Sequence, residues 1–250
     1  MELLGGAMRD EMEAYASGGW ADAANIGTQL LSYTAKGFKA IKMRVGVMDE
    51  TVAYSVARVK AARQALGPTI KIMVDAHGTF SVPEAKQFCK GVESCNLYWF
   101  EEPISPDNKK GSAEVRASTY IPIAAGESEY TRFEMRELVD LSAVDVLQPD
   151  AAIIGGITET IRVANLAATY QLELAPHCWG SAFSFMAGVN VAFASPAACI
   201  IEFSSGGNPM MFDLVEEQIE AKDGFILKPN KPGLGLTVNW DFVKEYSMNK

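Results

Sequence analysis

Ionisable side chains of complementary kinds recur along this sequence at a nearly constant interval. The set contains two cations, five acids and one histidine, namely Lys42, Arg44, Asp75, Glu101, Glu127, Asp150, His177 and Glu202. From Asp75 to Glu202, successive members lie 23 to 27 residues apart. One strand, one helix and their loops take about this length, so alternating strands and helices would place the set in one ring. A single polar strand end means little, because loops are polar, but six in phase indicate a common site.

Three of these carboxylates, Asp75, Glu101 and Glu127, follow consecutive predicted strands and form a hard oxygen site. Mg²⁺ binds through few protein carboxylates and keeps positions for water and substrate oxygens. Zn²⁺ would favour histidine or cysteine instead. The sequence therefore predicts a Mg²⁺ site. Glu102 follows Glu101 directly, and because alternate strand residues face opposite sides, we expect it behind the ligands or toward a helix.

His177 and Asp150 are candidates for proton transfer. An imidazole has an intrinsic pKa suited to accepting a proton near neutrality. A neighbouring carboxylate fixes the tautomer of the ring and stabilises the imidazolium. The chain has two histidines, and the second, His77, follows Asp75 by two residues.

Eight β-rich runs contain or precede these residues, and helical patterns separate the runs. They cover residues 15–20, 40–45, 71–76, 97–102, 121–127, 145–150, 173–178 and 198–203. Two of the intervening segments begin with the spacing of a capping box, in Ser81 with Glu84 and in Thr131 with Glu134. Alternating strands and helices predict a parallel sheet, and eight strands predict that it closes into a barrel.

The composition argues against several classes of protein. Of the 250 residues, 48% are hydrophobic and 21% are charged, which is the balance of an ordinary globular chain. The net charge of −9, without a block of basic residues, argues against a nucleic acid or an anionic membrane surface as a partner. Four cysteines without a CxxC spacing, and an amino terminus without an apolar stretch, favour a reduced, cytoplasmic location.

One apolar segment, residues 183–203, has about the length of a membrane span. It contains Asn190, Glu202 and the pair Ser195-Pro196. A proline disfavours a helical conformation in the residue before it. We therefore expect a helix that ends near Ser195, followed by a strand, and no membrane segment.

An ordered set of short motifs resembles a known family. The motifs are GFKAIKMRVG, VDAHG, WFEEP, AAGES, LQPD followed by IIGGIT, APHCWGSA and IIEF. In order and spacing they resemble the catalytic barrel of the enolase superfamily, in its mandelate racemase-like subgroup, over nearly the whole chain. The resemblance implies a TIM-like (β/α)7β barrel, a small carboxylate substrate, Mg²⁺ as cofactor and a homo-oligomer.

The resemblance also implies roles for individual residues. It implies that Asp75, Glu101 and Glu127 are the metal ligands and that Asp150 and His177 form an acid/base dyad. It also implies that Lys42 is the first lysine of a KxK motif and that Glu202 donates a hydrogen bond to the intermediate. A proton next to a carboxylate is weakly acidic, so the enediolate must be neutralised as it forms, by Mg²⁺ and Lys42. Glu202, if kept protonated among anions, would donate a hydrogen bond to the second enolate oxygen.

Two positions depart from the pattern of the family. The KxK motif reads Lys42-Met43-Arg44, and arginine is a poor general base because its pKa exceeds about 12. Arg44 is therefore expected to bind a carboxylate or hydroxyl of the substrate. His77 stands where the family has asparagine. It either contacts the substrate or metal-bound water, or has no functional consequence.

With His177 as the one credible base, the sequence favours a lyase that dehydrates an acid sugar to a 2-keto-3-deoxy acid. In a syn elimination, the same histidine would return a proton to the departing β-hydroxyl. Two alternatives stay open: a racemase or epimerase of 2-hydroxy acids with Arg44 or Lys42 as the opposite base, and a metal-binding barrel impaired in turnover. Muconate-type cycloisomerisation is disfavoured, because those relatives have lysines in place of Asp150 and His177.

Members of the family also carry an amino-terminal α+β capping domain that closes over the barrel mouth. The run ELLGG near the start resembles the junction between cap and barrel, so we expect the cap to be absent from this chain. The expected organisation is a junction at residues 1–12, a catalytic barrel at 13–222 and a carboxy-terminal extension at 223–250 that packs toward the cap.

Overall fold

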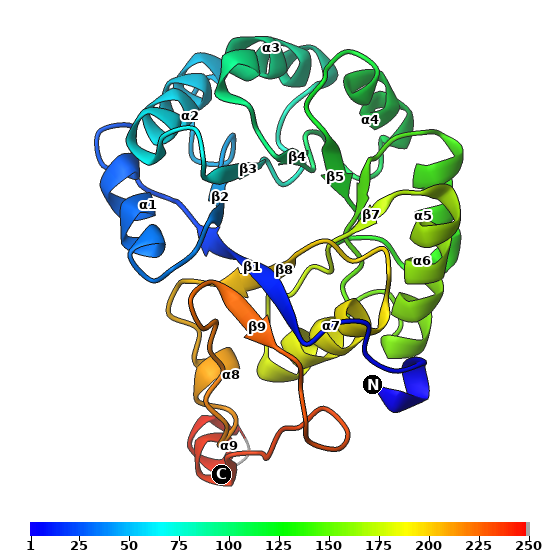
Figure 1. Cartoon of the computed structure of the whole chain (residues 1–250). Coiled ribbons are helices and arrows are strands. Elements are labelled where there is room, and N and C mark those ends of the chain that lie inside the picture. Colours follow the sequence, from blue (N-terminus) through cyan, green and yellow to red (C-terminus); the bar gives the residue numbers. More distant parts are fainter. Residues whose placement is uncertain (249–250) are drawn as a thin grey trace.

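The β-rich runs form a ring of parallel strands, and a helix follows each of the first seven strands (Figure 1). The computed structural model describes residues 1–248. The eight barrel strands are β1 (Glu11–Gly18), β2 (Ala40–Arg44), β3 (Lys71–Asp75), β4 (Trp99–Glu101), β5 (Ile123–Ala125), β6 (Val146–Leu147), β7 (Glu173–Leu174) and β8 (Ile201–Ser204).

The strands pair with their neighbours in chain order, and the first strand also pairs with the last. The sheet order is β7-β6-β5-β4-β3-β2-β1-β8, with every pairing in this series parallel. A parallel bridge between Leu174 and Ala198 joins β7 to the residues before β8 and closes the ring. The predicted TIM-like (β/α)7β barrel is confirmed.

Several strands differ in length from the predicted runs. β1 begins at Glu11 rather than at residue 15, because its first residues pair with a later strand described below. β6 and β7 have two residues each. Pro149 and Pro176 follow these two strands closely, and proline lacks the N–H that a ladder requires. The functional side chains beyond them therefore stand on extended loops.

Helices form the outer layer of the barrel. Those that connect barrel strands are α1 (Ile26–Thr34), α2 (Val52–Leu66), α3 (Val82–Val92), α4 (Lys109–Arg116), α5 (Thr131–Asp140), α6 (Ile157–Tyr170) and α7 (Ala182–Ala194). Two short helices, α8 (Pro209–Phe212) and α9 (Trp240–Tyr246), follow β8, and the 3-10 turns are η1 (Glu2–Leu4) and η2 (Glu93–Cys95).

One of the two predicted capping boxes is complete and the other is half formed. Ser81 and Glu84 cap α3 reciprocally, as predicted. At α5, the Glu134 carboxylate accepts a hydrogen bond from the Tyr130 N–H, but the Thr131 hydroxyl accepts one from the Phe133 N–H, at 3.3 Å, rather than from the N–H of Glu134. The reason is that Thr131 has a left-handed backbone, with φ of 59°, and is the first residue of the helix rather than its cap.

Apolar side chains form two separate cores. The outer core lies between the strands and the helices and includes the buried faces of α3 and α5. The inner core takes one residue from or beside each barrel strand, and we call these eight residues the barrel ring: Tyr15, Ala40, Met73, Trp99, Ala124, Val146, Ala175 and Ile200. Its two largest members, Tyr15 and Trp99, pack edge to face with ring centroids 5.4 Å apart.

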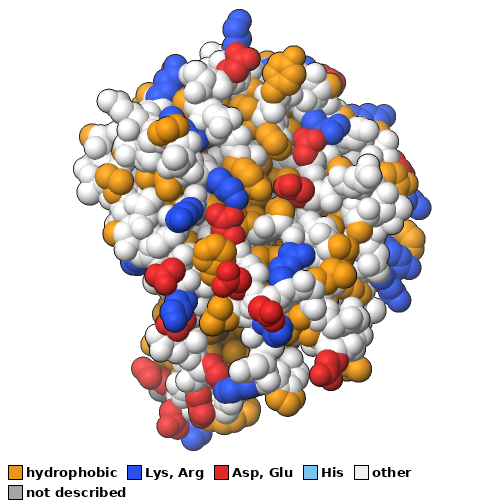
Figure 2. All heavy atoms as spheres, viewed as in Figure 1, with side chains coloured by type: hydrophobic (Ala, Val, Ile, Leu, Met, Phe, Trp, Pro, Cys, Tyr) orange, Lys and Arg blue, Asp and Glu red, His pale blue; other side chains and the backbone are white. Residues whose placement is uncertain are grey.

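The apolar segment at residues 183–203 divides as predicted. α7 ends at Ala194, and β8 begins at Ile201 after a turn that contains Ser195. Within residues 1–248, no helix is both long enough and apolar enough to cross a bilayer. Acidic and basic side chains are interspersed over the face of the molecule shown in Figure 2.

The carboxy-terminal segment begins by adding to the barrel sheet. β9 (Phe225–Leu227) pairs antiparallel with the first residues of β1, from Glu11 to Glu13 (Figure 1). These residues belong to the amino-terminal end of β1, opposite the end that carries the ionisable ring. Of the extension predicted at 223–250, the last two residues lie outside the described part of the chain.

A buried arginine in α2 connects the loops above β1 and β2. Arg58, 1% exposed, donates to the carbonyl oxygens of Gly19, Ala21 and Arg44 at 2.9–3.1 Å. Its Nη1 also lies 3.0 Å from Oδ1 of the buried Asp49. One side chain therefore satisfies three loop carbonyls and one buried carboxylate.

Replacing Arg58 with methionine should lower the free energy of unfolding by about 3–5 kcal/mol, because the buried Asp49 carboxylate would lose its only cationic partner among the described residues and keep only the Gly46 N–H and the Ser55 hydroxyl as donors. Urea denaturation of Arg58→Met measures the loss. Lys60→Met, at an exposed position of the same helix, is the matched control and should change little. Equal stability of the two variants would contradict the role given to Arg58.

Candidate active site

The ionisable residues predicted to form a ring lie together at the carboxyl end of the barrel. The strand register aligns Arg44 with Asp75, and Asp75 with Glu101. A parallel bridge aligns Asp150 with His177. All of the predicted acids of the ring are at least 90% buried. Asp75 and Glu101 end their strands, Glu127 and Asp150 follow theirs, and Glu202 lies within β8. Ionisable groups cluster here above the apolar barrel ring.

Three carboxylates converge in this cluster. Asp75, Glu101 and Glu127 each offer an oxygen, and these oxygens lie within 4.8 Å of one another. We call them the carboxylate trio. Lys42, which is 4% exposed, contacts Glu101 Oε1 and lies 3.6 Å from Asp75 Oδ2. Burial raises the pKa of the Glu101 carboxyl to about 8, although Lys42 opposes the shift. The trio is a hard, oxygen-rich donor set for a cation.

The second oxygen of Glu101 has two hydrogen-bond donors. Trp99 Nε1 lies 3.1 Å from Oε2 and Gln148 Nε2 lies 2.7 Å from it. Both donors are at most 1% exposed. The carboxylate of Glu101 is therefore contacted on both oxygens, on one by a lysine and on the other by two neutral N–H groups.

Two imidazoles contact the two oxygens of Glu127. His77 Nδ1 lies 3.1 Å from Oε1, and His177 Nε2 lies 3.4 Å from Oε2. Although burial opposes ionisation, these two rings hold the pKa of the Glu127 carboxyl at about 2. The two histidines of the chain thus lie on either side of one member of the carboxylate trio.

His177 is oriented by a buried acid. Its Nδ1 lies 2.7 Å from Asp150 Oδ2. The other oxygen of Asp150 accepts hydrogen bonds from the Ala152 N–H at 2.7 Å and from the Ser184 hydroxyl at 3.2 Å. Burial disfavours the imidazolium of His177, but Glu202 and Asp150 outweigh it and raise the histidine pKa to about 10. The arrangement leaves Nε2 directed at Glu127 and the centre of the site.

Glu202 differs from the sequence-based expectation of a protonated carboxyl. It lies 3.0 Å from Lys42 Nζ and accepts a hydrogen bond of 2.9 Å from the Cys178 N–H. Burial opposes ionisation, but Lys42 and His177 hold the pKa of Glu202 below its usual value. The expectation considered neighbouring anions and left out the adjacent lysine, which favours the charged form.

Arg44 lies at the edge of the site between an acid and an aromatic ring. Its Nη1 is 2.7 Å from Asp75 Oδ2, at an angle too poor for a hydrogen bond. Its guanidinium lies 5.0 Å from the centre of the Trp20 ring. A fifth of the Arg44 side chain and more than half of the His77 side chain are exposed, so both reach the mouth.

Glu102 does not face the helices, which corrects part of the sequence-based expectation. β4 ends at Glu101, and Glu102 has a left-handed backbone with φ of 37°. This turn breaks the strand alternation and brings its carboxylate to 3.7 Å from His77 Nδ1. His77, Glu102 and Glu127 thus form a second close group of ligand atoms that shares Glu127 with the trio.

Four residues of the site were not predicted from the sequence. Trp99 stands two residues before Glu101, and Gln148 stands two residues before Asp150, so strand alternation places both on the face that carries these acids. That signal was available. Ser184 and Trp20 come from a helix and a loop, and their contacts with Asp150 and Arg44 depend on tertiary packing alone.

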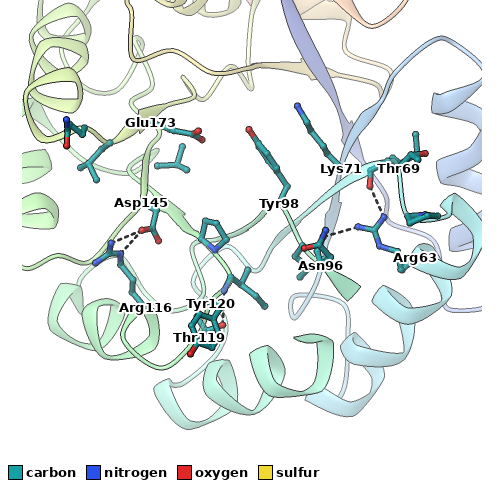
Figure 3. Close-up of a pocket in the computed structure, with 18 of the residues that line it drawn as sticks. Arg63, Thr69, Lys71, Asn96, Tyr98, Arg116, Thr119, Tyr120, Asp145 and Glu173 are labelled. Atoms are coloured by element: carbon teal, nitrogen blue, oxygen red, sulfur yellow. Dashed lines mark hydrogen bonds and ion pairs between the residues drawn. The ribbon is translucent and has the colours of Figure 1, made fainter. Parts of the chain in front are cut away.

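A cavity of about 1060 Å³ lies at the opposite end of the barrel (Figure 3). Residues that precede β3 to β7 line it. Its arginines already have partners: Arg63 donates to backbone carbonyls, including those of Cys95 and Ile70, and Arg116 pairs with Asp145. Figure 3 shows the pairing of Arg116 with Asp145 at the cavity wall. These cations support the structure, in keeping with the stabilising role of this barrel end.

Comparison with known proteins identifies the class of this barrel. A family model described as "Enolase C-terminal domain-like" matches residues 25–242. A D-galactarolactone cycloisomerase of Agrobacterium fabrum is 33% identical over 98% of this chain and 68% of its own length. A D-galactonate dehydratase of Ralstonia pickettii is 34% identical, with the same coverage of both chains.

A solved structure agrees with these relatives. The 3,6-anhydro-D-galactonate cycloisomerase from Zobellia galactanivorans has a TM-score of 0.92 and 33% identity, over 98% of this chain and 68% of that one. The chain belongs to the enolase C-terminal domain-like family, within the mandelate racemase-like part of the enolase superfamily. It spans about two thirds of the length of these relatives. The expected class of enzyme, a lyase or isomerase of this superfamily, is confirmed.

A divalent cation that binds the assembled carboxylate trio and not the unfolded chain should stabilise the fold. At a concentration about 100 times its Kd, the gain would be about 2.7 kcal/mol. Urea denaturation in MgCl₂, compared with NaCl of equal ionic strength, measures this gain. Glu127→Gln should lose it, and a gain of equal size in that variant would show that the cation binds elsewhere.

Proposed function

We propose that this chain removes the α-proton of an acid-sugar carboxylate and completes a dehydration to a 2-keto-3-deoxy acid. Supporting this proposal are the dehydratase among its relatives and the two imidazoles that contact the two oxygens of Glu127. The second observation carries most weight, because an elimination needs both a base for the α-proton and an acid for the leaving hydroxyl.

The carboxylate trio is proposed to hold Mg²⁺. Asp75, Glu101 and Glu127 supply only carboxylate oxygens, and Mg²⁺ prefers such ligands in small number. The buried, mutually repelling acids also favour a bound cation. When bound, Mg²⁺ would withdraw charge from the substrate carboxylate and so acidify the adjacent C–H. Proton transfer and binding of the substrate are assigned to side chains of the protein.

His177 is proposed to be the base. Asp150 fixes its Nδ1 at 2.7 Å, so Nε2 is the nitrogen that would accept the α-proton. A cation held by the carboxylate trio would offset the acids that raise the pKa of His177 and so favour the neutral ring that a base requires. Ser184 and the Ala152 N–H in turn hold Asp150, which keeps the imidazole from rotating. Proton removal leaves an enediolate, whose added negative charge needs neighbouring donors.

Lys42 and Arg44 are proposed to bind the substrate carboxylate and the enediolate formed from it. Lys42 is buried and faces the trio, where a cation counters charge that develops in the transition state. Arg44 stands at the mouth with part of its guanidinium exposed, and is placed for a distal carboxylate or hydroxyl. Glu202, ionised and paired with Lys42, orients that lysine.

His77 is proposed to donate the proton that releases the β-hydroxyl. It lies on the other oxygen of Glu127 from His177, and its side chain is more exposed to the mouth. His177 takes the α-proton, and the β-hydroxyl leaves as water after it receives a proton from His77. An enol remains. The enol then becomes the 2-keto-3-deoxy acid. This division of roles replaces the syn elimination expected from the sequence.

Isomerisation is the second candidate, because two of the relatives described above are cycloisomerases. In a racemisation or epimerisation, the same enediolate would be reprotonated rather than lose a hydroxyl. A racemase or epimerase would exchange the α-proton of both antipodes, whereas the proposed dehydratase exchanges it in one.

We also propose that residues 13–222 form the catalytic unit.

His177→Asn should abolish exchange of the α-proton, because asparagine keeps much of the size of the ring but accepts no proton. Removing a general base of this kind lowers rates by about 10²–10⁴-fold. The measurement is deuterium incorporation in D₂O, with Mg²⁺ and a panel of acid sugars, followed by NMR. Equal exchange in the parent chain and the variant would overturn the base assignment, and no exchange in either would favour an impaired barrel.

His77→Gln should separate the two halves of the reaction. The variant should retain α-proton exchange but form the keto acid much more slowly, because only the departing hydroxyl loses its proton donor. Parallel assays of exchange by NMR and of keto acid by semicarbazide derivatisation measure the two steps. Unchanged product formation would restore the syn elimination by His177.

A further inference from the structure

Gln148 and Trp99 occupy the layer directly beneath the carboxylate trio. Trp99 belongs to the barrel ring, and Gln148 follows β6 at the level of Glu101. Each directs one N–H group to the same atom, Glu101 Oε2. A carboxylate oxygen accepts about two such hydrogen bonds comfortably, so Oε2 has little capacity left for a metal.

The other oxygen of Glu101 lies on the side of Lys42 and Asp75. Oε1 contacts Lys42, whose Nζ is 3.6 Å from Asp75 Oδ2. We infer that Gln148 and Trp99 are positioning residues for the metal, because they hold one oxygen of Glu101 and leave the other on the side of Asp75, a second member of the carboxylate trio. The inference rests on the proposed function, since it concerns the same metal site.

The backbone at Gln148 is fixed in a way that suits this role. Its N–H donates to the Ala125 carbonyl at 3.0 Å, which ties β6 to β5. Gly126 packs against it, with φ of 131°, and a Cβ there would lie 3.2 Å from Gln148 N and 2.7 Å from Met135 Cε. Glycine thus lets the two strand ends approach closely enough for Gln148 to reach Glu101.

An amide suits this position better than a carboxylate of the same shape. Gln148 Nε2 supplies a donor, whereas a glutamate would place a second negative charge 2.7 Å from Glu101. The Gln148 Oε1 atom is buried and has no hydrogen-bond partner among residues 1–248. A purely structural glutamine would be expected to use both ends of its amide, so the single contact with Glu101 is the specific one.

The test measures metal affinity rather than turnover, with Mn²⁺ as the probe. Electron paramagnetic resonance of free Mn²⁺ gives the Kd of the parent chain, of Gln148→Leu and of Trp99→Phe. Loss of a group that orients a metal ligand weakens binding by about 10- to 100-fold, which is the rise in Kd expected for Gln148→Leu. Trp99→Phe removes the longer of the two hydrogen bonds and should raise the Kd less.

Ser204→Ala is the matched control, because its buried hydroxyl has no hydrogen-bond partner within the described chain. Its Kd should equal that of the parent. Thermal unfolding in a chelator reports the metal-free stability of each variant, and a merely structural role would lower that stability without changing the Kd.

The outcomes separate this inference from the proposed function. If the parent chain binds no Mn²⁺, the metal site and this inference both fail. If the parent binds Mn²⁺ and a folded Gln148→Leu binds it equally well, the inference alone is overturned. Should Gln148→Leu not fold, an unchanged Kd in Trp99→Phe overturns the inference, and a raised Kd supports it.

Discussion

Mutual repulsion among buried acids is the constraint on which this molecule depends. Asp75, Glu101 and Glu202 approach one another around Lys42, with little water to screen them. Like charges at such distances oppose folding unless cations and hydrogen-bond donors offset them. One lysine and two histidines supply part of that offset. The repulsion that is not offset favours the binding of a further cation at the carboxyl ends of the strands.

The barrel ring supplies the rigid floor that such an arrangement requires. Trp99 and Tyr15 are the largest members of this ring and pack edge to face, while alanines at positions such as 124 and 175 are among its smallest. A large residue at one of these alanine positions would have to displace an aromatic ring, because interiors are packed as densely as crystals. Packing below the site and charge above it are thus coupled through Trp99, which belongs to both layers.

Periodic features of the sequence predicted the fold and the membership of the acidic cluster. The interval between Asp75, Glu101 and Glu127 corresponds to one strand and one helix per repeat. The spacing alone therefore predicted that the three residues lie at the same end of the barrel. Contacts between distant segments had no such signal. The turn that redirects Glu102 depends on one left-handed residue, and the ionisation of Glu202 depends on a lysine that the fold brings beside it. No periodic pattern in the sequence predicts either the turn at Glu102 or the ionisation of Glu202.

The pairing of β9 with β1 has a consequence for how the chain reaches its native state. β2 is near β1 in the sequence, whereas β8 and β9 pair with β1 across about 190 to 220 residues. Lys228 and Asp10, 218 positions apart, are hydrogen-bonded both through their backbones and through their side chains. Closing loops of this length is slow, and contacts of high sequence separation form late. During folding, β1 therefore keeps unpaired backbone groups until residues 201–227 are in place, and such groups are a site at which aggregation can begin.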